Sequence, residues 1–248
     1  MINQIVICIP IKLNSRKAIA DALLDKYGTE YVFMGSSLLK IASKEDCEIQ
    51  IGDRTYFLDN FSIDLVKAIE LAGQNTITPT TLEKVSHCQQ LIYLKSYGVG
   101  YDTCLIMANF ARVFLNLGGI AVYVESAGLA HQASQWLNCY NSTDVFDIYS
   151  LYVGLVEGED IYYSCGMHNF GKADVALDIT EDIGLAIYVM NVFNYYRLTE
   201  SPILQDGHTF QPDIQCPSYK MELIDDSENY IDSPMFNPYG RWHLTLNI

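Results

Sequence analysis

The segment DIYYSCGMHNFGKADVALDI, residues 160–179, decides the local fold of the second part of the chain. Residues 160–167 and 173–179 are rich in β-forming side chains, and the second of them alternates apolar and polar residues, so both are predicted to be strands. Gly166 and Gly171 bracket the short connection between them. Because glycine adopts a positive φ angle without a Cβ clash, these two residues are predicted to turn the chain from one strand to the next.

The residues of this connection divide into two kinds. Met167 and Phe170 are expected to turn inward as apolar plugs, and His168 and Asn169 are expected to stay at the tip. Cys165 and His168 raise the question of a nucleophile pair, but nothing adjacent identifies a third group that would orient the histidine. Since Cys165 lies in a strand whose alternate residues point inward, we interpret it as a packed, unreactive thiol. No catalytic residue is predicted.

Outward from this segment, strand and helix patterns alternate along the chain. The predicted strands are residues 4–13, 31–34, 47–51, 55–61, 90–97, 120–125, 147–156, 160–167, 173–179 and 241–248. The predicted helices are residues 15–28, 63–72, 78–85, 101–119, 129–140 and 180–198. The first 100 residues follow the order β-α-β-β-α-β of a split βαβ, ferredoxin-like unit. The sequence therefore predicts an α+β fold of two ferredoxin-like or split βαβ-type halves, with mixed or antiparallel sheets covered by helices.

Composition points to one large globular unit. Of the 248 residues, 50% are hydrophobic and only 18% are charged, which is enough to bury a substantial core. A single globular domain over residues 1–248 is predicted, with two fused halves, 1–100 and 101–248, as the alternative. The seven cysteines form no CxxC pair and no framework, which favours reduced thiols. The chain lacks a secretory signal pattern and a long uncharged apolar run, so we expect a cytoplasmic protein.

Negative charge is concentrated in the second part of the chain. The formal net charge is −15, and residues 101–248 hold nineteen acidic residues against five basic ones. Such a surface repels phosphate backbones and anionic membranes and attracts a basic protein. We therefore predict a basic protein partner, with no direct binding to nucleic acid or membrane. The alternative is that the acidic residues only keep a tyrosine-rich protein soluble.

No pattern in the sequence indicates a cofactor or a metal ion. The five histidines are isolated, and the chain lacks HxH, HExxH, HxxxH, GxGxxG and GK[ST] motifs. Neither a cofactor nor a metal is predicted. If a pocket exists, its candidate members are the polar residues of two glycine-containing turns: His168, Asp174, Asp206 and His208.

The segment YKMELIDDSENYIDSPMFNPYG, residues 219–240, is the part of the sequence that a purely structural role explains least well. It mixes acidic and aromatic residues in a proline-bearing loop, which is typical of an interface that steers by charge and anchors by aromatic side chains. The alternative is a solvated connection to the last strand. The predicted partner-binding residues are Glu222, Asp225, Asp226, Glu228, Tyr230, Asp232 and Phe236.

Two short motifs carry a resemblance to a known family. They are Gly166, Met167, Phe170 and Gly171 followed by Asp174, where the family usually has Glu, and Asp206, Gly207 and Thr209. Together with the order of the predicted strands and helices, these motifs make residues 1 to about 215 resemble the bacterial family called domain of unknown function 4261. The resemblance implies no established reaction. It does not extend to residues 216–240.

Three functions from different classes remain open. The first, which we favour, is a non-catalytic cytosolic binding protein, an antitoxin-like immunity protein that covers a basic, nuclease-like toxin with its acidic C-terminal part. The second is an enzyme or small-molecule binder that uses a pocket near His168, Asp174 and His208. The third is a structural subunit of a larger assembly, which the eighteen tyrosines and the apolar composition favour.

Overall fold

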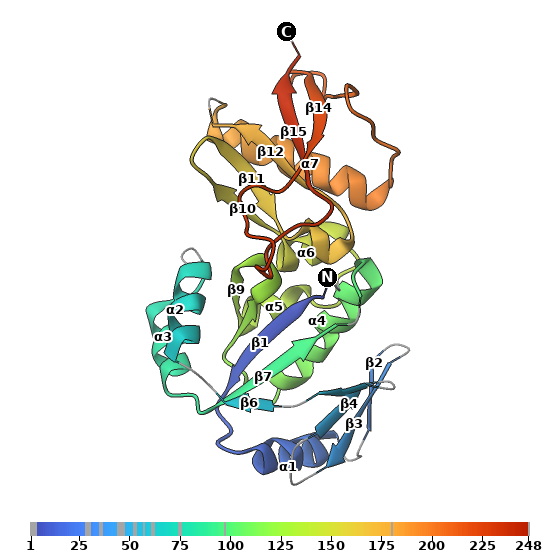
Figure 1. Ribbon diagram of the computed structural model, residues 1–248. Coiled ribbons are helices and arrows are strands. Elements are labelled where there is room, and N and C mark those ends of the chain that lie inside the picture. The colour runs from blue at the N-terminus through green and yellow to red at the C-terminus, as the bar shows by residue number, and fades with distance from the viewer. Residues whose placement is uncertain are drawn as a thin grey trace.

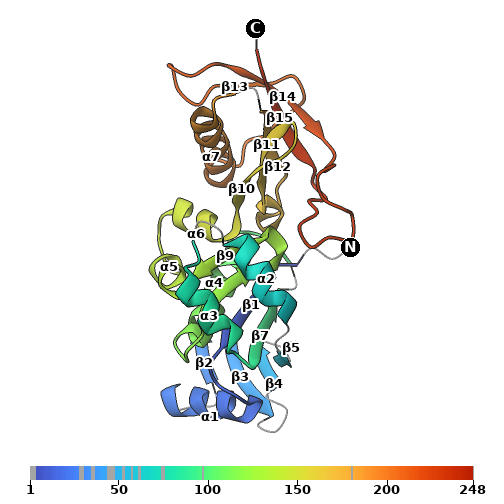
Figure 2. The ribbon, with the colours of Figure 1, turned by 90° about the vertical axis from the view of Figure 1, so that its left-hand side faces the viewer.

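Three sheets follow one another along the long axis of the protein (Figures 1 and 2). The computed structural model describes residues 4–27, 31–34, 37–43, 48–51, 54–56, 58–60, 63–73, 76–96, 98–179 and 181–247. A five-stranded sheet occupies the middle, a six-stranded sheet carries the C-terminus, and a four-stranded sheet lies at the opposite end (Figure 1).

The middle sheet has the order β6-β7-β1-β8-β9, and all its neighbouring strands are antiparallel. Its strands are β1 (Val6–Ile11), β6 (Leu58–Asn60), β7 (Gln90–Lys95), β8 (Ala121–Val124) and β9 (Leu129–Gln132). The central strand β1 is buried along its whole length, as expected for an uninterrupted apolar run. Helix α4 (Tyr101–Leu115) packs against β1, and its residues form much of the largest hydrophobic core. The prediction of a largely buried helix here is confirmed.

Shorter elements surround the middle sheet. Helices α2 (Ile63–Ala72) and α3 (Pro79–Ser86) pack near β9, and the predicted N-cap of α3 is confirmed because Thr78 accepts a hydrogen bond from the Thr81 amide. Helix α1 (Arg16–Tyr27) follows β1. The four-stranded antiparallel sheet contains β2 (Tyr31–Met34), β3 (Ser37–Ser43), β4 (Glu48–Ile51) and β5 (Arg54–Tyr56). Strand β3 was not predicted.

The six-stranded sheet is mixed and has the order β10-β11-β12-β15-β14-β13. Its strands are β10 (Gly154–Glu157), β11 (Ile161–Cys165), β12 (Asp174–Asp178), β13 (Thr209–Phe210), β14 (Tyr219–Ile224) and β15 (Arg241–Leu246). Only β12 and β15 run parallel among its neighbouring pairs in the described residues. Helix α7 (Ile183–Thr199) covers this sheet and buries Phe193 and Met190 in a second core. Asp182 caps α7, and the predicted cap at residue 180 lies outside the described residues.

Two predicted elements are wrong in type. Residues 147–152 belong to helix α6 (Val145–Tyr152), because Asp144 caps it by accepting the Phe146 amide hydrogen bond and its apolar residues bury one helical face. The predicted helix 129–140 begins as strand β9, and only α5 (Ala133–Cys139) is helical.

The α+β fold class, with antiparallel and mixed sheets covered by helices, is confirmed. The sheets do not divide at residue 100, because β8 pairs directly with β1. The boundary between the middle and six-stranded sheets falls between β9 and β10. Among the described residues, no helix has the length and apolar character needed to cross a bilayer.

Candidate functional site

The connection between β11 and β12 forms a short 3-10 helix, η2 (Met167–Phe170). Gly166 has a φ angle of 122° and Gly171 one of 71°, so the predicted positive φ angles are confirmed. A Cβ atom at residue 166 would lie 2.0 Å from the carbonyl oxygen of Tyr152. Glycine is therefore required there by both backbone conformation and space.

Of the four residues of η2, two are oriented as the sequence predicted and two are not. Met167 and Phe170 are buried in the largest core, and Phe170 packs edge-on against Tyr152 at 6.0 Å between ring centroids. His168 and Asn169, expected at the tip, are also buried. The reason is that η2 folds the tip back, so that the Asn169 side chain donates to the Tyr152 carbonyl at 3.3 Å.

Asp174, the first residue of β12, is a buried hydrogen-bond acceptor. Its carboxylate accepts hydrogen bonds from the Ser164 hydroxyl at 2.9 Å, the Met167 amide at 3.1 Å and the Asn237 side-chain amide at 2.6 Å. Burial raises the pKa of Asp174, and the nearby His168 and these donors offset part of that rise. The arrangement ties η2 and residue 237 to the start of β12, a central strand of the six-stranded sheet.

His168 lies within electrostatic range of Asp174, and burial lowers the pKa of its ring. The carbonyls of Ser126 and Pro234 also face the ring and partly oppose this shift, but neither ring nitrogen reaches hydrogen-bond geometry with a described residue. Neither His168 nor Asp174 lines one of the principal cavities among the described residues. Their burial favours a structural role for both residues, in which they hold neighbouring segments of the chain together.

A second buried polar group joins Asp226 to Arg241. The Arg241 Nη2 atom donates to Asp226 Oδ1 at 2.6 Å, and both side chains are almost completely buried. The Arg241 guanidinium also lies over the Tyr163 ring, 4.5 Å from its centroid. The prediction that Asp226 contacts a partner is wrong, because its carboxylate is used inside the protein to fix the start of β15.

These two groups hold residues 225–240 in place, and we call this segment the anchored loop. Asn237 links them: its backbone amide donates to Asp226 at 2.9 Å, and its side chain donates to Asp174 and to the Lys172 carbonyl. The loop extends from the six-stranded sheet toward the middle sheet (Figures 1 and 2). Its Met235 contacts Gly128, where a Cβ atom would lie 2.8 Å from the methionine sulfur.

The remaining predicted partner-binding residues lie at the surface of the anchored loop and β14. Those exposed are Glu222, Asp225, Glu228, Tyr230 and Asp232, and Phe236 is half-buried. Tyr230 is 88% exposed, and Ile231, which the sequence did not single out, is 62% exposed. In the sequence, exposed acidic residues therefore flank two large side chains, Tyr230 and Ile231, that the fold leaves uncovered.

Burial also removes two of the five positive charges of residues 101–248 from the surface. Of the five basic residues in 101–248, Arg197 and Arg241 are buried, Arg112 and Lys172 are half-buried, and Lys220 is exposed. Only two of the nineteen acidic residues, Asp174 and Asp226, are buried. The exposed surface of residues 101–248 is therefore more one-sidedly acidic than the residue counts indicate.

The four predicted pocket residues do not come together. Asp206 and His208 lie in the exposed turn before β13, where Asp206 accepts a hydrogen bond from the Leu223 amide at 2.8 Å. His208 lines an open groove beside Phe193 and Phe210, whereas His168 and Asp174 are sealed in the interior. The predicted shared pocket is wrong because the two glycine-containing turns lie on different parts of the fold.

The region offers neither an exposed thiol nor a metal-binding cluster among the described residues. Cys165 is 3% exposed, and burial raises the pKa of its thiol, so its interpretation as a packed thiol is confirmed. Across the described ranges, no group of three His, Cys, Asp or Glu side chains is placed to hold a metal ion.

Comparisons with protein-family models, with curated proteins and with solved structures found no match. The resemblance to the family called domain of unknown function 4261 stays a prediction.

Proposed function

We propose that this is a non-catalytic cytoplasmic binding protein that captures a basic protein partner through the anchored loop and the adjoining strand β14. The observation that carries the proposal is the combination of four exposed acids with uncovered apolar side chains on the anchored loop, which buried hydrogen bonds hold in place, and on the adjoining strand β14. The four acids are Glu222, Asp225, Glu228 and Asp232. Tyr230 lies among them and is almost fully exposed.

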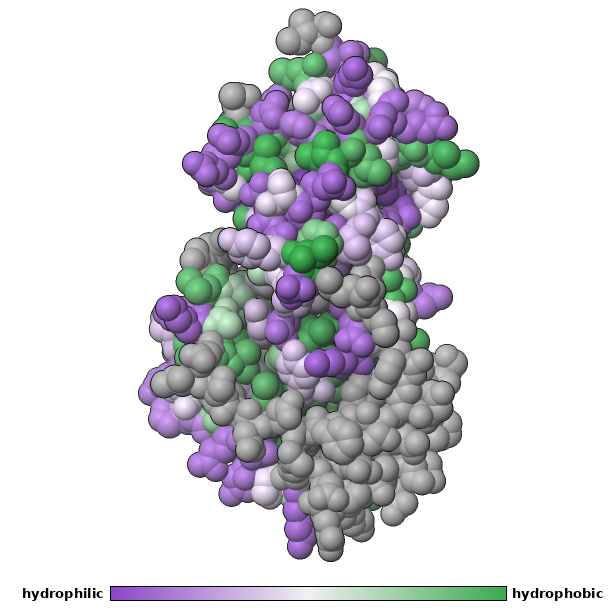
Figure 3. All heavy atoms as spheres, in the orientation of Figure 1, coloured by the Kyte–Doolittle hydropathy of each residue, from purple (hydrophilic) through white to green (hydrophobic). Residues whose placement is uncertain are grey.

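Charge supports a basic partner. With two of the five cations of residues 101–248 buried, little positive charge opposes the exposed carboxylates of this part. Figure 3 shows that the face over the six-stranded sheet is mostly hydrophilic, with hydrophobic residues interspersed. A surface of one sign accelerates encounter with a partner of the other sign and repels nucleic acid and anionic lipid.

Rigidity of the loop supports binding of a defined partner. Asp226 and Asn237 hold the loop backbone by buried hydrogen bonds, so the exposed side chains are presented without first ordering the chain. A pre-organised surface binds more tightly because less conformational entropy is lost. An exposed tyrosine with acidic neighbours in the sequence is the type of side chain that anchors interfaces. In this proposal His168 and Asp174 help to hold the loop.

Among basic partners, we favour a nuclease-like toxin, which makes the protein an antitoxin-like immunity protein. A protein that cleaves nucleic acid needs a basic surface to hold the phosphate backbone. An acidic surface with an aromatic anchor would compete with nucleic acid for that same surface. Binding is then expected to inhibit the toxin by covering it.

The test is capture of a partner from the native cell, followed by identification by mass spectrometry. The bait is wild-type protein, and the test variant carries lysine at residues 222, 225, 228 and 232. A control with the same change in net charge carries lysine in place of the exposed acids Asp21, Asp25, Glu70 and Glu83. We expect one basic protein to be captured by the wild type and the control and to be lost with the test variant. Equal capture by the test variant, or capture of acidic proteins only, would overturn the proposal.

A further inference from the structure

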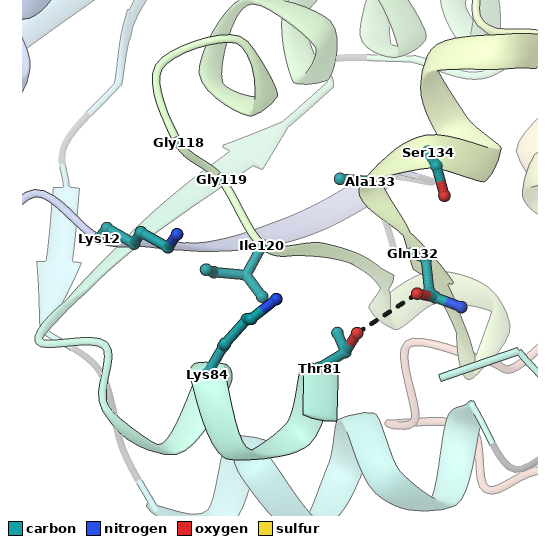
Figure 4. A pocket seen from close by; sticks show the side chains of 9 residues that line it. All are labelled: Lys12, Thr81, Lys84, Gly118, Gly119, Ile120, Gln132, Ala133 and Ser134. Atoms are coloured by element: carbon teal, nitrogen blue, oxygen red, sulfur yellow. Dashed lines mark hydrogen bonds between the residues drawn. The ribbon is translucent and has the colours of Figure 1, made fainter. Parts of the chain in front are cut away.

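A cavity of about 270 Å³ lies at one end of the middle sheet, far along the chain from the anchored loop. Four segments meet there: the residue after β1, helix α3, the turn before β8 and the junction of β9 with α5 (Figure 4). We call it the lysine pocket. Its lining residues are Lys12, Thr81, Lys84, Gly118, Gly119, Ile120, Gln132, Ala133 and Ser134.

The lysine pocket gathers positive charge in an acidic protein. Lys12 and Lys84 come from segments distant in sequence, and both side chains extend toward Ile120 (Figure 4). None of the residues that line the pocket is acidic, and no carboxylate of the described residues forms an ion pair with either lysine. Two ammonium groups that share a pocket repel each other, and an anion between them would relieve that repulsion.

Polar side chains beside Lys84 are held in a fixed arrangement. The Gln132 side chain donates to the Thr76 carbonyl at 2.8 Å and accepts a hydrogen bond from the Thr81 hydroxyl at 3.3 Å. Thr81 is in turn hydrogen-bonded to Thr78 at 3.0 Å. Ser134, near Gln132 in Figure 4, is exposed. A ligand would therefore meet two exposed cations and polar side chains that are already hydrogen-bonded.

We propose that the lysine pocket binds a compact dianion, either a phosphate group or a short dicarboxylate, between Lys12 and Lys84. Two ammonium groups match two negative charges, and charge-assisted hydrogen bonds are the stronger kind. The cavity is smaller than the range of about 300–1,000 Å³ that is typical of drug-sized ligands, which favours a small occupant. The site lies apart from the partner surface and does not depend on the proposed function.

The experiment is isothermal titration calorimetry of the 248-residue protein with two probes, inorganic phosphate and succinate, at constant ionic strength. The test variant carries Lys12→Gln and Lys84→Gln. The control carries Lys67→Gln and Lys220→Gln, two exposed lysines outside the pocket with the same change in net charge. Circular dichroism verifies that both variants keep the wild-type fold, as expected because all four lysines are exposed.

We expect saturable binding of at least one probe to the wild type and the control, and a dissociation constant raised about tenfold or more in the test variant. Preference for phosphate over succinate would assign a phosphate-bearing ligand, and the reverse would assign a dicarboxylate. Equal affinity of the wild type and the test variant, or no saturable binding of either probe to the wild type at millimolar concentration, would overturn the proposal.

Discussion

The Asp226→Asn substitution is expected to destabilise the protein strongly although it keeps the size and shape of the side chain. Every group that faces the two carboxylate oxygens of Asp226 at hydrogen-bond distance is an N–H donor. Oδ1 accepts from Arg241 and from the amides of Glu228 and Asn229, and Oδ2 accepts from the backbone amide of Asn237 and the side chain of Asn229. In either orientation, the new NH₂ group of asparagine would therefore face another donor.

The magnitude follows from burial. Arg241 is 1% exposed, and no carboxylate of the described residues other than Asp226 forms an ion pair with it. The substitution leaves a buried guanidinium without a counter-charge, and breaking a buried pair by changing one partner costs about 3–5 kcal/mol. We expect a loss of this size in the free energy of unfolding. The anchored loop should also become accessible to protease, since Asp226 fixes its N-terminal end.

The assay is urea-induced unfolding followed by tryptophan fluorescence, with limited proteolysis as the second readout. The neighbouring Asp225→Asn variant is the matched control, because Asp225 is exposed and its loss is expected to change stability by less than about 0.5 kcal/mol. If Asp226→Asn costs less than about 1 kcal/mol, the buried pair does not hold the loop, and the reasoning fails.

Two further predictions concern stability. Burial lowers the pKa of His131 to about 4, so below pH 6.5 the unfolded chain takes up a proton that the folded protein does not take up until about pH 4. As the pH falls through that window, the free energy of unfolding is expected to drop by about 3 kcal/mol because of this group. Urea unfolding at several pH values should show a smaller drop for His131→Gln than for the wild type. An equal drop in both proteins would contradict the burial of a neutral His131 ring. Gly166→Ala should cost more than about 4 kcal/mol, because its Cβ atom would meet the Tyr152 carbonyl, whereas Gly171→Ala should cost about 1 kcal/mol from backbone strain alone. The same urea assay compares the two variants, and similar losses would be inconsistent with the close approach at residue 166.

The features that the sequence predicted correctly are local ones. The apolar positions of α4, the cap at Thr78 and the positive φ angles at Gly166 and Gly171 each depend on residues close together in the chain. Hydrophobic periodicity and turn chemistry report such features directly. These features were sufficient to predict the α+β class.

The errors arose where distant contacts decide the outcome. Residues 147–152 alternate well enough to resemble a strand, but they form a helix whose Tyr152 donates to the Cys104 carbonyl at 2.8 Å. Periodicity alone does not separate a short buried helix from a strand. Strand β3 was missed, and β8 crosses the predicted division by pairing with β1.

The candidate site shows the same limit. Charge and aromatic content indicated an interaction surface in residues 219–240, and most of its acids are exposed. That Asp226 instead pairs with Arg241 inside the protein has no signature in the sequence, because the two residues are 15 positions apart and only the fold brings them together. Lys12 and Lys84 are likewise brought together only by the fold.

Whether the anchored loop binds a basic partner is tested most directly by the dissociation constant of the captured partner, measured at low and at physiological salt. The proteins to compare are the wild type, the variant with lysine at residues 222, 225, 228 and 232, and Tyr230→Ala. We predict nanomolar binding that weakens with salt, a rise of about a hundredfold or more for the charge-reversed variant, and a rise of about tenfold for Tyr230→Ala. Affinities that are unchanged in both variants and independent of salt would contradict binding through this loop.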